Sequence, residues 1–125
     1  MRLLLDTHVV LWELEGSRRV SKAAREAIEQ ATELLFSVVS FAEIGVKASI
    51  GKLTVPTDLH AHVLQSGLTV LGLDAGHGLA VAHLPAQHRD PFDRLLVAQA
   101  RSEQLTLVSA DRRLAEYDVP FVDAG

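Results

Sequence analysis

Four acidic residues stand where the chain leaves an expected strand or enters an expected helix. They lie in the segments LLLDTH, SFAEIG, DPFDRLL and VSADRRL, as Asp6, Glu43, Asp93 and Asp111. A carboxylate that follows an apolar strand lies at the carboxyl edge of a parallel sheet, which is where open α/β folds bind their ligands. If these four acids converge at that edge, they predict a divalent-cation site.

The chemistry of such a site follows from its charge. Two carboxylates 4 Å apart repel by about 4 kcal/mol at an effective dielectric constant near 20, so a cation must offset them. Oxygen ligands without histidine or cysteine favour Mg²⁺, with Mn²⁺ as a second choice, over zinc. The implied reaction is in-line hydrolysis of a phosphodiester, in which metal activates water and stabilises the leaving oxygen.

Each of the four acids also has a simpler explanation as a helix cap. Asp and Glu in the first helical turn accept from free backbone N–H groups and complement the helix dipole. Three of them, Asp6, Glu43 and Asp111, follow apolar runs and should project from one edge of a sheet. Asp93 joins them if its helix packs beside the first strand. Capping and metal binding are compatible, so the common edge favours a site.

The expected elements alternate along the chain. Short apolar runs predict strands at 3–5, 34–39, 68–73 and 105–109, with a final edge strand at 120–122. Helices are expected at 8–13, after the cap Ser21, at 40–50, 56–66, 74–84, 91–104 and 111–116. Ser40 and Glu43 have the spacing of a capping box. Asp90 is expected to cap the helix that Pro91 begins.

This alternation predicts an α/β fold: a three-layer sandwich with a central parallel sheet of four to five strands, flanked by helices. The chain has 125 residues, 48% hydrophobic and 22% charged, which is typical of a globular protein. We expect one domain over residues 1–125. The absence of cysteine excludes disulfides, thiolate catalysis and cysteine-based metal sites.

Charge and hydropathy set further bounds. The formal net charge is −4, but four of the sixteen acids belong to the candidate site, so charge neither favours nor excludes a nucleic-acid partner. The first apolar stretch, residues 3–5, is too short for a signal peptide or a membrane span. We therefore expect a cytoplasmic protein with no membrane association.

The chain resembles a known family over nearly its whole length. The segments LLLDTHVVLW, FAEIGVKASIGKLTVP, LPAQHRDPFDRLLVAQA and LTLVSADRRLAEY are similar, in order and spacing, to those of PIN-domain ribonucleases, and specifically of the VapC-like toxins of type II toxin–antitoxin (VapBC) systems. The DPFDRLL segment is the most distinctive. The resemblance implies a PIN-like fold and a magnesium-dependent endoribonuclease, which a small VapB-like antitoxin holds inactive. It also implies a homodimer.

The resemblance assigns roles by position. Asp6 and Asp93 correspond to the principal metal ligands, and Glu43 and Asp111 complete the acidic set. Supporting positions are Thr7 and Ser109, which match small hydroxyl residues that orient acids or water, and Asp90, whose primary role is expected to be the helix cap.

Basic and apolar residues near these segments are candidates for partner contacts. The basic residues near the acids are candidates for binding RNA phosphates, with Arg94 foremost because it adjoins Asp93: Lys47, Arg89, Arg94, Arg112 and Arg113. Of these, Lys47, Arg94 and Arg112 are the expected substrate contacts. His88 is a further candidate for an RNA contact. Apolar residues that are either core or an antitoxin surface include Trp12, Ile50, Leu53 and Val55.

One rival class shares the size and the α/β alternation: a receiver-type signalling module that is phosphorylated on an aspartate. Such a module needs an acidic pair after the first strand and a lysine after the fifth, whereas Asp6 stands alone and no lysine follows the last strand. Asp74 would be the phosphoacceptor. A zinc site built on the six histidines is disfavoured, because no H-E-x-x-H pattern or cysteine partner occurs.

Overall fold

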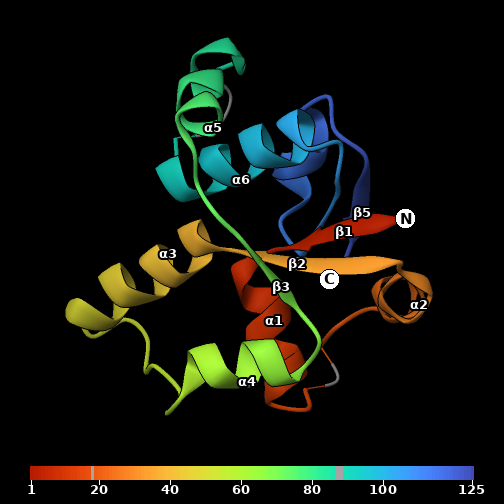
Figure 1. Cartoon of the computed structure of the whole chain (residues 1–125), viewed down its shortest axis with the longest axis vertical. Coiled ribbons are helices and arrows are strands. Elements are labelled where there is room, and N and C mark those ends of the chain that lie inside the picture. The colour runs from red at the N-terminus through yellow and green to blue at the C-terminus, as the bar shows by residue number, and fades with distance from the viewer. Residues whose placement is uncertain (18, 87–88) are drawn as a thin grey trace.

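A five-stranded parallel sheet forms the centre of the computed structural model, which describes residues 1–17, 19–86 and 89–125 (Figure 1). The strand order is β3-β2-β1-β4-β5, and every neighbouring pair is parallel. The strands are β1 (Arg2–Leu5), β2 (Glu33–Ser37), β3 (Thr69–Leu71), β4 (Thr106–Ser109) and β5 (Phe121–Asp123). The predicted three-layer α/β sandwich is confirmed, with five strands in its sheet.

Helices cover both faces of this sheet. In Figure 1, α5 and α6 lie above it, α1 and α4 lie below it, and α3 continues from the end of β2. The bounds are α1 (Thr7–Leu14), α2 (Lys22–Gln30), α3 (Val38–Ser49), α4 (Leu59–Gln65), α5 (Ala75–Ala80) and α6 (Pro91–Ser102), with short 3-10 helices η1 (Val81–His83) and η2 (Arg112–Glu116).

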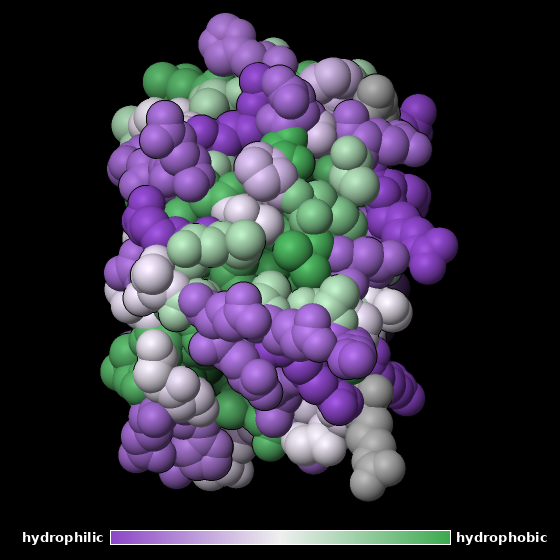
Figure 2. Space-filling view, turned by 90° about the vertical axis from the view of Figure 1, so that its right-hand side faces the viewer, coloured by the Kyte–Doolittle hydropathy of each residue, from purple (hydrophilic) through white to green (hydrophobic). Residues whose placement is uncertain are grey.

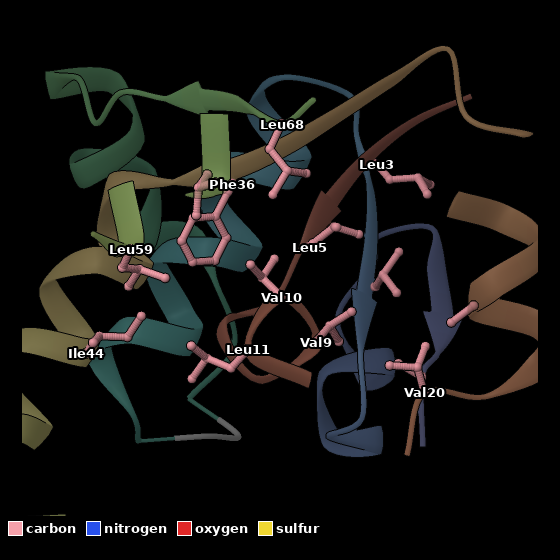
Figure 3. Close-up of a cluster of buried hydrophobic side chains, with 14 residues drawn as sticks. Leu3, Leu5, Val9, Val10, Leu11, Val20, Phe36, Ile44, Leu59 and Leu68 are labelled. Carbon is pink, nitrogen blue, oxygen red and sulfur yellow. The ribbon is translucent and has the colours of Figure 1, made fainter. Parts of the chain in front are cut away.

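The strands bury side chains on both faces because successive residues of a strand point in opposite directions. Leu3 and Leu5 face a core formed with α1, α2 and α4, which Figure 3 shows in close-up. Leu4 faces the other core, formed with α6 and η2. All three leucines are 3% exposed or less, so β1 is fixed between two packed layers and its last residue has little freedom to move.

The sheet register places the ends of the strands at one edge. Leu5 of β1 pairs with Val108 of β4, and the next N–H, that of Asp6, donates to the carbonyl of Val108 at 2.9 Å. Asp6 and Ser109 therefore leave adjacent strands side by side. The sheet brings the starting points of α1 and η2 together in the same way, so residues about 100 positions apart in sequence become neighbours.

The strand order argues against the receiver-type alternative. Receiver modules such as those of the flavodoxin-like class have the order 2-1-3-4-5, whereas this chain has 3-2-1-4-5. Asp74, the residue proposed there as phosphoacceptor, accepts from the His77 N–H at 2.8 Å and caps α5. We therefore discard that alternative.

The largest difference from the sequence prediction concerns the start of α3. The predicted strand over 34–39 ends at Ser37, and the helix begins at Val38 with Ser37 as its cap: Ser37 Oγ accepts from the Val39 N–H at 3.0 Å. The expected capping box of Ser40 and Glu43 is therefore wrong. Ser40 lies inside the helix, and its hydroxyl is buried without a hydrogen-bond partner among the described residues.

Other boundaries differ less. The helix expected over 56–66 begins at Leu59, because Asp58 takes a left-handed conformation with φ of 55°. The strand expected over 68–73 is limited to Thr69–Leu71, and the helix expected to reach residue 84 becomes 3-10 after Ala80. The caps Ser21, Asp74 and Asp90, and Pro91 in the first turn of α6, are as predicted.

The face on the right of Figure 1 carries the N-terminus and α2, at the side where β1 begins. Figure 2 shows that apolar residues gather in the middle of this face and polar residues surround them. The acids that follow β1 and β4 lie at the opposite ends of the strands. Within the described residues, no helix is long and apolar enough to cross a membrane.

Candidate functional site

One pocket of about 200 Å³ contains all four acids that the sequence singled out. We call it the acidic pocket. It opens at the carboxyl edge of the sheet, where β1, β4, α3 and α6 meet. Its lining residues are Asp6, His8, Glu43, Lys47, Asp90, Asp93, Asp111 and Arg113.

Asp6 is the most enclosed of the pocket's aspartates. Its side chain caps α1, accepting from the Thr7 N–H at 2.7 Å, and its other oxygen accepts from the Ser109 hydroxyl at 2.7 Å. Burial raises the pKa of Asp6 above its ordinary value, and the nearby Glu43 carboxylate raises it further. The two hydrogen bonds lower the pKa of Asp6 and partly offset this effect. A nearby cation would favour its ionised form.

Glu43 lies on α3 and is 3% exposed. One of its oxygens accepts from the Thr7 hydroxyl at 2.6 Å, and the other forms an ion pair with Lys47, one helical turn further along α3. Hydrogen bonding to Glu43 raises the pKa of Lys47, and the carboxylates of Asp90 and Asp93 raise it further. Lys47 is therefore a fixed positive charge facing the acids.

Two hydroxyl side chains connect the acids. Thr7 donates its N–H to Asp6 and its hydroxyl to Glu43. Ser109 donates its hydroxyl to Asp6 and accepts from the Asp111 N–H at 3.0 Å. Both side chains are fully buried, so each holds two segments of the site in a fixed relation. This geometry agrees with the supporting roles expected of Thr7 and Ser109.

The start of α6 contributes the next two acids. Asp90 is its cap, and its side chain accepts from the Phe92 and Asp93 N–H groups at 2.9 and 3.3 Å. Asp93 stands in the first helical turn, is half-buried, and lines the pocket. A carboxylate at a helix N-terminus is stabilised in its ionised form by the helix dipole. Asp90 also lines the pocket, so its capping role does not remove it from the site.

Asp111 is held by Arg113. It caps η2 by accepting from the Arg113 N–H at 3.1 Å, and its two oxygens accept from the Arg113 guanidinium at 3.0 and 2.8 Å. The Arg113 pKa is raised above its usual value by this bidentate contact. Asp93 and Asp90 also act on Arg113, so it faces the same pocket as Lys47.

The donor set fits a hard divalent cation in chemistry and in charge. Five carboxyl groups line the pocket against two cationic side chains, Lys47 and Arg113, which leaves negative charge in excess. Yet among residues 1–17, 19–86 and 89–125 no three acidic or histidine side chains are grouped closely enough to form a ready-made metal site. The acids instead surround the pocket, held by hydrogen bonds and by the two cations.

The predicted phosphate contacts divide into two groups. Lys47 lines the pocket, as expected of a substrate contact. Arg94 does not: it donates to the carbonyls of Val81, Leu84 and Pro85 and so supports the segment after η1. Arg112 is also outside the pocket lining.

Arg112 pairs instead with Asp123 of β5 at 2.8 Å. The sequence prediction ranked Arg94 first because it adjoins Asp93, but adjacent helical residues point to different sides of a helix. Arg113 and His8 line the pocket instead, two residues after an acid in each case. His88, the other candidate contact, lies outside the described residues.

A second polar cluster, which was not predicted from the sequence, lies at the same edge of the sheet. Gln99 of α6 is fully buried; its oxygen accepts from the Ser37 hydroxyl, and its NH₂ group donates to the Gly72 carbonyl at 3.2 Å. His77 Nδ1 lies 3.3 Å from that NH₂ group, and its Nε2 lies 3.3 Å from Glu103. We call this chain the Gln99 network.

Comparison with known proteins identifies the family of this chain. The sequence matches the PIN domain family over residues 3–120. It is 32% identical over 121 residues to Ribonuclease VapC22 of Mycobacterium tuberculosis, covering 94% of this chain and 93% of the relative.

Solved structures with the same fold come from toxin–antitoxin complexes. VapBC2 of Rickettsia felis, bound to a DNA fragment from its promoter, aligns over all of both chains with a TM-score of 0.73 at 14% identity. VapBC-1 of nontypeable Haemophilus influenzae aligns over 98% of each chain with a TM-score of 0.68 at 19% identity. These two likenesses concern the fold, and the family match rests on sequence. The chain belongs to the PIN-domain family.

Proposed function

We propose that this protein is a magnesium-dependent endoribonuclease toxin, which hydrolyses phosphodiester bonds of RNA at the acidic pocket. The observation that carries this proposal is the gathering of five carboxyl groups around one pocket, with negative charge in excess, at the ligand-binding edge of a PIN-domain sheet. The relative that is named a ribonuclease supports the choice of RNA.

Asp6 and Asp93 are the principal metal ligands in this proposal, and Asp111 and Glu43 complete the set. Mg²⁺ would be the resident ion, and Mn²⁺ would serve in its place, because both prefer carboxylate oxygens. The ion would supply the positive charge that activates a water and stabilises the leaving oxygen. The protein's own contribution is to hold Asp6 rigid through Thr7 and Ser109.

Lys47 and Arg113 provide the positive charge that the RNA backbone requires. Both line the pocket and both are paired with an acid, Glu43 and Asp111 respectively. A phosphate that enters the pocket meets these two cations beside the carboxylates, and charge-assisted hydrogen bonds to phosphate are among the stronger ones in proteins. Their expected role is to orient the phosphate rather than to hold the metal.

A VapB-like antitoxin is the proposed inhibitor, since one neighbour in fold is titled a toxin–antitoxin complex and others are titled VapBC. Large exposed apolar residues on α3, α4 and the loop between them offer it a surface: Val46, Ile50, Val55 and Leu64. Leu53, also named from the sequence, packs against the core instead. A homodimer is likewise part of the proposal, and light scattering of the purified chain would test it.

The direct experiment is cleavage of single-stranded RNA by the antitoxin-free protein with Mg²⁺, and with EDTA as the metal-free reference. We expect Asp93→Asn to abolish cleavage. Asp118→Asn is the matched control, because it makes the same chemical change at an exposed acid outside the pocket. Full activity of Asp93→Asn, or cleavage that persists in EDTA, would refute the proposal.

A further inference from the structure

Side chains with planar groups extend from the acidic pocket along α1. His8 lines the pocket, and Trp12 follows it one helical turn later on the same helix. Trp12 is the only tryptophan of the chain. It is half-buried and packs against the core between the sheet and α1, so its ring is firmly held while part of it remains in contact with solvent.

The rings of His8 and Trp12 lie close to each other without stacking face to face. Their centroids are 6.2 Å apart and their planes are inclined by 33°. The guanidinium carbon of Arg19 lies 5.9 Å from the centroid of the Trp12 ring, close to the outer limit of about 6 Å for a cation–π contact. Arg19 is exposed, so its guanidinium can move away from the indole and cover a planar group that binds to the indole.

We propose that His8, Trp12 and Arg19 form a base-stacking subsite, which holds a nucleotide next to the scissile phosphate of single-stranded RNA. This inference rests on the proposed ribonuclease function and adds how the substrate is positioned. Unpaired bases stack on aromatic rings and on guanidinium planes. Here the aromatic surface begins with His8 at the pocket that would hold the phosphate, and the guanidinium lies over Trp12, one helical turn further along. A base on Trp12 would lie beneath Arg19.

His8, Trp12 and Arg19 together form a strip of side chains. The composition of this strip fits a nucleobase better than an apolar protein segment. Among the described residues, none of the large exposed apolar side chains lies on α1 or in the loop that follows it. Those on α3, α4 and their loop form a separate surface, which is the proposed antitoxin contact. The strip offers one indole, one imidazole and one guanidinium, which are the groups that stack on bases irrespective of sequence.

A subsite of this kind would favour unpaired RNA over a duplex. In a duplex each base is already stacked and paired, so its face is not accessible to the indole unless the strand is opened. A single strand presents its bases freely. The strip therefore selects the conformation of the substrate, while Lys47 and Arg113 contact its backbone without regard to sequence.

The single indole makes the test direct. The fluorescence of Trp12 is measured during titration of the Asp93→Asn protein with a short single-stranded RNA of mixed sequence. Two further probes are the same strand with abasic sites and the strand annealed to its complement. We expect saturable quenching by the mixed strand, no quenching by the duplex, and binding of the abasic strand that is about 5- to 100-fold weaker and leaves fluorescence unchanged.

Variants separate stacking from general binding. In cleavage assays, Trp12→Leu should raise KM by about 5- to 100-fold with little change in kcat, and Trp12→Phe should restore most of the affinity. Arg19→Ala should raise KM by about 2- to 5-fold. Arg25→Ala, at an exposed arginine of α2, is the matched control. The fluorescence titration and Arg19→Ala keep the test decisive if Trp12→Leu fails to fold.

The outcomes distinguish this subsite from the function on which it rests. Quenching by RNA without cleavage by the wild-type protein would support the subsite and refute the nuclease. Cleavage with unchanged fluorescence and an unchanged KM in Trp12→Leu would refute the subsite alone. Equal quenching by the abasic strand would also refute it. So would a Trp12→Leu protein that binds RNA normally but no longer binds its protein inhibitor, because Trp12 would then belong to the partner surface.

Discussion

The acidic pocket and the Gln99 network are two polar clusters at the same edge of one sheet, and they differ in how their charges and hydrogen bonds are balanced. The pocket lies beyond β1 and β4, and the network lies beyond β2 and β3, where Ser37 ends one strand and Gly72 follows the other. Ser37, His77 and Gln99 of the network are buried, whereas the pocket is lined by buried, half-buried and exposed side chains. Both clusters connect segments far apart in sequence.

Within the network, donors and acceptors match. Ser37 donates to the Gln99 oxygen and accepts from the Val39 N–H. The NH₂ group of Gln99 has two acceptors, the Gly72 carbonyl and His77 Nδ1. His77 Nε2 then faces Glu103. A set in which donors face acceptors in this way helps to fix a fold.

The charges of the acidic pocket are balanced less completely than the hydrogen bonds of the Gln99 network. Its acids accept hydrogen bonds and two of them are paired with Lys47 and Arg113, but negative charge remains in excess and burial raises the pKa of Asp6. Such unfavourable electrostatics persist in proteins mainly at functional sites. This difference supports the proposal that the ligand site is the pocket, whose charges the protein leaves unbalanced, rather than the network, whose donors face acceptors.

The largest expected effect is on activity, and it should be confined to the pocket. Asp6→Asn keeps the size of the side chain and an oxygen for the Thr7 N–H but removes the negative charge. We expect the single-turnover rate of RNA cleavage in Mg²⁺ to fall by at least about 100-fold, because changes to the partners of metal ligands already cost 10- to 100-fold. A rate within a few-fold of wild type would remove Asp6 from the metal site.

The second effect is on stability, and it should be confined to the network. Gln99→Leu removes the acceptor of the Ser37 hydroxyl and the donor to the Gly72 carbonyl, both in a buried position. We expect the free energy of unfolding in urea to fall by about 2 to 4 kcal/mol. Gln30→Leu, at an exposed position at the end of α2, is the control. An unchanged stability of Gln99→Leu would mean that the network contributes nothing to the fold.

A smaller effect concerns pH. The pKa of Asp6 is raised in the folded protein, chiefly by burial, so between the ordinary pKa and the raised one the folded state binds more protons than the unfolded state. Stability present at low pH is therefore lost as the pH rises through the raised pKa. Urea unfolding without metal should show this loss in wild type and a shallower one in Asp6→Asn. A profile identical in both proteins would contradict it.

The smallest effect compares the two serines at the start of α3. Ser37→Ala removes the cap and a partner of Gln99, so we expect a loss of about 1 to 2 kcal/mol. Ser40→Ala removes a buried hydroxyl that has no partner among the described residues, so stability should rise by about 0.5 to 1 kcal/mol. Urea midpoints measure both. A loss of stability in Ser40→Ala would favour the discarded capping box.

Much of the fold was predictable because its signals are local. Apolar runs such as residues 3–5 and 105–109 became central strands, and Ser21, Asp74 and Asp90 cap the helices that they were expected to cap. The start of α3 was not predictable in this way. Ser37 and Ser40 are both plausible caps in sequence, and β2 stops pairing with β3 at Ser37, which decides between them.

The candidate site, like the fold, was predictable from the sequence only in part. Asp6, Asp93 and Asp111 were identifiable because each follows a strand or stands at the start of a helix, whereas Glu43 was singled out from a helix start that the structure moves to Val38. The cations were identifiable only in part: Lys47 was expected and lines the pocket, but proximity in sequence favoured Arg94 over Arg113. The helix turns Arg94 toward the carbonyls of Val81, Leu84 and Pro85, whereas Arg113 folds back onto Asp111. The direction of a side chain depends on packing that a linear pattern does not contain.

The sequence by itself determined the alternation of strands and helices, the acids at the carboxyl edge and the family to which the chain is similar. Hydrophobic periodicity and helix capping act within a few residues, so they can be read along the chain. Only the tertiary structure decided that Thr7 and Ser109 connect the acids, that Lys47 and Arg113 face them, and that Gln99 is buried among neutral partners. These contacts join residues many positions apart, because the order of the strands, rather than the order of the sequence, determines which side chains meet.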